Sequence, residues 1–91
     1  MKFVYPAIIE PTKEGYHAHF HDLAMCEADG KTLDDVLRNA RDAMYNWIDL
    51  ELQEDTPVMP YVTDIEDIEK KSGQEVRNIM VHYRYTEGWD E

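Results

Sequence analysis

The chain has 91 residues, which suits one domain and leaves no room for two, so we expect a single domain over residues 1–91. Its 20 Asp and Glu residues outnumber its 9 Lys and Arg residues, for a formal net charge of −11. A chain this acidic lacks the basic surface that neutralises phosphates, so we expect no direct nucleic-acid binding. The charge fits a basic protein partner and plain solubility equally well.

The first eleven residues contain no long apolar run. We therefore expect neither a signal peptide nor a membrane span, and we place the protein in the cytoplasm. Cys26 is the single cysteine, which excludes an internal disulfide. Its neighbours supply no positive charge that would stabilise a thiolate, so we expect a buried structural cysteine.

Residues 2–28 predict a hairpin followed by a third strand. From Phe3 to Glu10 both alternating sets of residues are largely apolar, which indicates a strand covered on both faces. Pro6 cannot donate a ladder hydrogen bond, which favours an edge position or a bulge there. The turn that follows ends at Gly15, where a glycine is free to adopt positive φ.

In the second strand of this hairpin, apolar residues alternate with histidines from residue 16 to residue 21. Tyr16, Ala18 and Phe20 would face the core, and three histidines would face the other way. A short run from Leu23 to Glu27 predicts the third strand.

A long amphipathic helix is predicted over about residues 33–52. Thr32 is a good N-cap residue, and acidic residues follow it at the positive end of the helix dipole. Apolar residues then recur at spacings of three and four and fall on one stripe: Leu33, Val36, Leu37, Ala40, Met44, Trp47 and Ile48.

The remaining residues predict an extended acidic excursion over 53–75, a final strand over about 76–85 and a polar tail over 86–91. The order is therefore β-β-β-α-β. An antiparallel sheet with one helix packed on one face is an α+β fold. One helix covers only one face, so the other face needs a partner or must be polar.

The sequence contains an H-x-H-x-H run, formed by His17, His19 and His21. Alternate histidines on one strand face are able to share a metal ion, although a tight site usually draws ligands from more than one element. Two other interpretations are an exposed polar face and an interface that becomes charged below about pH 6.5. No nucleophile elbow, phosphate-binding loop, dinucleotide fingerprint or zinc-finger spacing is present, so we expect no enzyme, no catalytic residue and no cofactor.

Taken in order, these residues resemble the HicB family, the antitoxin half of HicBA toxin–antitoxin pairs. The resemblance runs from Phe3 to about Leu52 and is carried by Tyr5-Pro6-Ala7, Gly15-Tyr16, Phe20-x-Asp22-Leu23, Cys26, Gly30-x-Thr32-Leu33, and Asn39-Ala40 through Ala43 to Trp47. It implies a partial ribonuclease-H-like sheet with one helix. It also implies a partner, a small basic HicA-type ribonuclease toxin that degrades messenger RNA and whose active site the antitoxin covers.

Three positions depart from the family pattern: His21 stands where a proline is typical, and Ala24 and Met25 replace a Pro-Gly pair. Many family members carry a DNA-binding domain after this core, whereas here the main signal after the helix is a strand. We therefore expect the core domain alone, as a homodimer or homotetramer.

The resemblance does not place the toxin contact. We assign it to the acidic residues Asp34 and Asp35 at the helix start and Glu54 and Asp55 in the excursion. Two alternatives remain open, a metal- or small-ligand-binding protein that uses the three histidines, and an oligomeric scaffold without a toxin.

Overall fold

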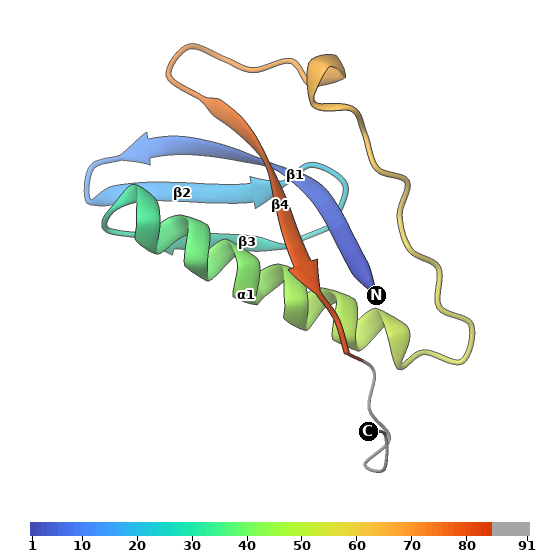
Figure 1. Ribbon diagram of the computed structural model, residues 1–91. Coiled ribbons are helices and arrows are strands. Elements are labelled where there is room, and N and C mark those ends of the chain that lie inside the picture. The colour runs from blue at the N-terminus through green and yellow to red at the C-terminus, as the bar shows by residue number, and fades with distance from the viewer. Residues whose placement is uncertain (85–91) are drawn as a thin grey trace.

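In the computed structural model, which describes residues 1–84, a four-stranded antiparallel sheet carries one long helix on one face (Figure 1). The elements are β1 (Lys2–Thr12), β2 (Gly15–Phe20), β3 (Glu27–Gly30), α1 (Leu33–Leu52), a 3₁₀ turn η1 (Ile65–Asp67) and β4 (Glu75–His82). The strand order across the sheet is β3-β2-β1-β4. The predicted α+β class and element order are confirmed.

The hairpin of β1 and β2 pairs Thr12 with Gly15 at its closed end. Gly15 has φ +152°, a conformation that favours glycine. A Cβ atom at this position would lie 2.2 Å from the carbonyl oxygen of Gly30. Glycine is therefore needed at residue 15 both for the turn and for the close approach of the chain that leads into α1.

Strand β1 lies inside the sheet, so the expectation that Pro6 marks an edge or a bulge is wrong. The pairing of β1 with β4 runs without interruption from Lys2 to Ile9. The amide nitrogen of His21 donates to the carbonyl oxygen of Pro6, so the main-chain groups of the proline face β2. Because the β1–β2 ladder begins only at Ala7, the absent donor falls where no ladder bond is required.

The third strand lies further along the chain than predicted, at Glu27–Gly30 instead of residues 23–27. Leu23 and Cys26 are buried, but they belong to the turn between β2 and β3. An apolar run therefore produced the strand prediction, whereas its side chains fill the core from a turn.

Helix α1 begins at Leu33 and ends at Leu52, the bounds expected from its apolar stripe. The hydroxyl of Thr32 accepts a hydrogen bond of 3.1 Å from the amide nitrogen of Asp35, as an N-cap should. Gly30 lets the chain pass close to the first turn, since a Cβ atom there would lie 2.3 Å from the amide nitrogen of Val36. One core joins the helix to the sheet and includes the fully buried residues Ala7, Ala18, Val36, Ala40, Met44 and Ile48.

The segment between α1 and β4 connects the two ends of the molecule. In Figure 1 it runs from the C-terminal end of α1 up one side of the molecule, through η1, to the start of β4. Most of it forms neither helix nor strand, in keeping with the predicted excursion. Strand β4 ends at His82, and the predicted strand end at Tyr85 and the tail 86–91 lie outside the described residues.

Candidate functional site

The buried thiol of Cys26 has no feature of a nucleophile. Its side chain belongs to the core, where burial and then the nearby Glu27 carboxylate raise its pKa to about 11. The thiol therefore stays protonated near neutral pH, when a catalytic cysteine must be a thiolate. The predicted burial of this cysteine is confirmed.

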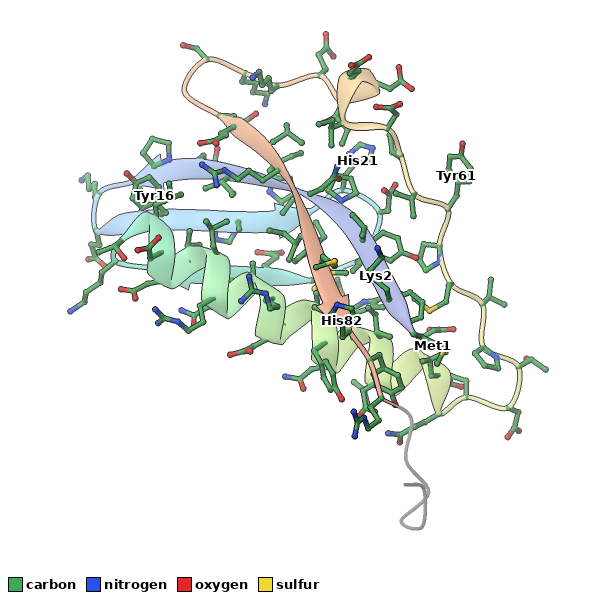
Figure 2. The ribbon with its side chains drawn as sticks, in the orientation of Figure 1. Met1, Lys2, Tyr16, His21, Tyr61 and His82 are labelled. Atoms are coloured by element: carbon green, nitrogen blue, oxygen red, sulfur yellow. The ribbon has the colours of Figure 1, made fainter. Side chains whose placement is uncertain are left out.

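The three histidines do not act as one cluster. His17 and His19 lie on β2 with ring centroids 6.3 Å apart. His21, which is labelled in Figure 2, follows the strand and is exposed. The Nδ1 atom of His17 lies 2.7 Å from Asp29, and its Nε2 atom lies 3.2 Å from Glu27. Within residues 1–84, no group of three or more His, Cys, Asp or Glu side chains is arranged to hold a metal ion.

Both ring nitrogens of His17 thus face carboxylates on the edge strand β3. Only the protonated imidazolium has two N–H groups to donate to both of them. The hydrogen bond to Asp29 is the main cause that raises the pKa of His17, and the charges of Asp29, Glu27 and Glu10 act in the same direction against partial burial. His17 therefore links β2 to β3, and the link is strongest when its ring is protonated.

The four acidic residues expected at a partner contact do not come together. Asp34 and Asp35 lie in the first turn of α1, and Asp35 also accepts a hydrogen bond of 3.3 Å from Arg38. Glu54 and Asp55 follow the other end of the helix, and both are exposed. A 20-residue helix separates the two pairs by about 30 Å, so one small contact cannot use both.

The segment after α1 is held against the fold by bonds to residues far away in sequence. The hydroxyl of Tyr5 donates to the carbonyl oxygen of Pro60 at 2.7 Å. The amide nitrogen and the hydroxyl of Thr63 both donate to the carboxylate of Asp22, at 2.8 and 2.6 Å. This anchored segment also carries exposed apolar side chains, Tyr61 among them, and the sequence alone did not mark them as functional. The sequence signal was the apolar pair Tyr61-Val62, next to Pro60 within an acidic stretch.

A groove of about 530 Å³ lies between α1 and the outer edge of β4. Its helix side includes Leu37, Arg41 and Tyr45, and its strand side includes Arg77 and Ile79. The Tyr45 ring, which lies off the predicted stripe, packs on Tyr83 with centroids 5.2 Å apart. The groove therefore combines apolar walls with two arginines beside an open strand edge.

The family model described as "HicB_like antitoxin of bacterial toxin-antitoxin system" matches residues 5–83 of the sequence. The chain belongs to the HicB-like antitoxin family. The match includes α1, β2, β3, β4 and most of β1, and it extends well past the region that carried the resemblance in the sequence.

Solved structures of HicB antitoxins share this fold. The N-terminal domain of the Burkholderia pseudomallei antitoxin HicB is 22% identical, with a TM-score of 0.68 over 91% of this chain and 100% of that one. A chain of the HicA3–HicB3 toxin–antitoxin complex is 26% identical, with a TM-score of 0.68 over 84% of this chain and 94% of that one. The antitoxin HicB3 is 26% identical, with a TM-score of 0.70 over 88% of this chain and 62% of that one.

Comparison with curated protein sequences gave no significant match. In the part of this HicB-like chain that the structure describes, no helix is long and apolar enough to cross a membrane.

Proposed function

We propose that this HicB-like chain is a non-enzymatic antitoxin that binds a small basic HicA-type toxin and neutralises it by covering its active site. The observation that carries the proposal is the family match over residues 5–83. The similarity to a chain of the HicA3–HicB3 complex supports a HicA-type partner. Such a toxin degrades messenger RNA, as the family resemblance implies, so we place the pair in the cytoplasm.

The charge of the chain supports the same partner. A net charge of −11 would attract a basic ribonuclease and speed its association, and it would repel nucleic acid. An inhibitor of this kind needs complementary shape and charge, and it needs no nucleophile of its own. The protonated, buried thiol of Cys26 and the carboxylate-bound His17 are consistent with that role.

The proposal predicts that a small basic protein is encoded beside this chain, and it is tested by co-expression of the two. We expect that protein to halt growth when produced alone, and we expect this chain to restore growth and to co-purify with it. A neighbour that halts growth but is neither neutralised nor bound by this chain would overturn the proposal.

We further propose that copies of the chain associate through the outer edge of β4. Tyr83 exchanges hydrogen bonds with Met1, so its main-chain groups face β1, and those of His82, Met80 and Asn78 alternate outward. Within residues 1–84, β4 pairs with β1 alone, which leaves these outward groups available to a second strand. The groove beside them would receive side chains of the second copy.

Light scattering after size exclusion tests the association. We expect the mass of a dimer or tetramer for the full chain, and a monomer for Asn78→Pro, which removes one outward N–H group and leaves the β1 ladder intact. A full chain that is monomeric at micromolar concentration would contradict the proposal.

A further inference from the structure

Exposed apolar side chains are concentrated in one short stretch of the chain. In the described residues 1–84, eight large hydrophobic side chains are exposed, and four of them lie between residues 58 and 65. We call these four residues, Val58, Tyr61, Val62 and Ile65, the apolar ledge. Tyr61 is 86% exposed and Val58 is 71% exposed. Figure 2 shows Tyr61 pointing away from the rest of the molecule.

The main chain beneath the apolar ledge is fixed in place. The amide nitrogen of Val58 donates to the Glu51 carboxylate at 3.0 Å, and Pro60 accepts from Tyr5 at 2.7 Å. Thr63 is held twice by Asp22. Met59 packs against the core, so inward or tethered residues lie between Val58 and Tyr61 and between Val62 and Ile65. A segment held in this way pays little conformational entropy when it binds a partner.

Acidic residues surround the apolar ledge. Residues 51–69 contain seven Asp and Glu and no Lys or Arg. An exposed aromatic side chain at the centre of an apolar patch, with a charged rim, has the layout of a protein-binding hot spot. The negative charge of this rim favours a basic partner, because two acidic surfaces repel one another at close range.

We propose that the apolar ledge is the surface on which the basic toxin docks, with Tyr61 as its central anchor and the surrounding carboxylates steering the approach. This inference rests on the proposed antitoxin function. It moves the contact away from Asp34 and Asp35 and keeps Glu54 and Asp55 at its margin. A second copy of this acidic chain is the less suitable occupant, since it would bring a second acidic rim against the first.

The test measures binding to a HicA-type protein encoded beside this chain, in a catalytically inactive variant so that it can be produced alone. Calorimetry is run with the wild type, Tyr61→Ala, Val58→Ser and Leu50→Ser. Val58 and Leu50 are similarly exposed, at 71% and 67%, but Leu50 lies on α1 outside the ledge. We expect Kd to rise about 30-fold or more for Tyr61→Ala and about fivefold for Val58→Ser, and to change less than about twofold for Leu50→Ser.

Hydrogen exchange provides an independent readout, since toxin binding should protect the backbone amides of residues 58–65 other than Pro60 in the wild type. A Tyr61→Ala variant that binds as tightly as the wild type would overturn the docking surface and leave the antitoxin function standing. A wild type that does not bind the toxin would overturn both. If the ledge variants change the oligomer mass and not the toxin affinity, a second copy occupies the ledge and the inference fails.

Discussion

Asp22, in the turn after β2, accepts two hydrogen bonds from Thr63, one from its amide nitrogen and one from its hydroxyl. Thr63 lies 41 positions further along the chain. This contact ties the segment after α1 to the corner between β2 and β3. Because Tyr61 lies two residues before Thr63, the same contact fixes the main chain beneath the apolar ledge. The position of the proposed docking surface thus depends on a side chain from the first quarter of the sequence.

Replacing Asp22 by Ala should free this segment. We expect the free energy of unfolding in urea to fall by about 2–3 kcal/mol, because two hydrogen bonds to a charged group are lost. Chymotrypsin should also cleave faster after Tyr61. The matched control is Asp55→Ala, at an exposed carboxylate, which should change stability by less than about 0.5 kcal/mol. Equal stability of the two variants would contradict the anchoring role of Asp22.

His17 should make the stability of the fold depend on pH. Its pKa is raised in the folded chain, chiefly by the hydrogen bond to Asp29, above the ordinary value of 6.5. The stabilisation is therefore fully present below about pH 6.5 and is lost as pH rises through the raised folded value. Both carboxylate partners are exposed, so we expect less than about 1 kcal/mol.

Thermal unfolding between about pH 5.5 and about pH 9 measures this dependence. The wild type should melt at a higher temperature than His17→Gln at low pH, and this difference should shrink as pH rises. The exposed His21→Gln serves as the control and should follow the wild type. A difference that grows with pH would have the wrong sign for a protonated His17.

Two glycine substitutions should separate steric crowding from backbone strain. Gly30→Ala places a Cβ atom 2.3 Å from the amide nitrogen of Val36, so β3 and α1 must move apart, and we expect a loss of at least about 2 kcal/mol in urea unfolding. Gly73→Ala meets no atom within 4 Å but keeps φ +86°, and it should cost only about 1 kcal/mol. The reverse order of the two losses would contradict the close packing of Gly30 on the helix.

The thiol of Cys26 should be inert in the native state. Its burial and a pKa of about 11 leave almost no thiolate at about pH 8, so a thiol reagent should react only after unfolding in guanidinium. Rapid reaction of a chromogenic thiol reagent with the native protein would show that the core around Cys26 opens readily.

Local signals predicted most of the fold. The Thr32 cap and the apolar stripe located α1, and the alternation around Ala18 located β2. The third strand was misplaced because its sequence, Glu27–Gly30, has no apolar alternation, and its carboxylates contact His17 on the neighbouring strand. The prediction from Pro6 was wrong because an interior strand tolerates proline just beyond the end of a ladder, and the β1–β2 pairing stops at Ala7.

The candidate site was harder to predict than the fold. Carboxylates pointed to the acidic stretch of Glu54 and Asp55, which borders the proposed docking surface, and equally to Asp34 and Asp35 at the far end of α1. Nothing local to Tyr61 indicates that its neighbours are tied to Tyr5 and Asp22. A residue becomes a rigid exposed anchor only through such long-range bonds, which are absent from the sequence pattern.

The central claim is that this HicB-like chain neutralises a toxin by covering its active site. The most direct measurement is the ribonuclease activity of the neighbouring HicA-type protein on messenger RNA, titrated with the purified, folded chain. The account predicts that activity falls in proportion to added chain and vanishes at an equimolar ratio, and that Tyr61→Ala requires a clear excess. Full ribonuclease activity in the presence of a saturating excess of the wild-type chain would contradict it.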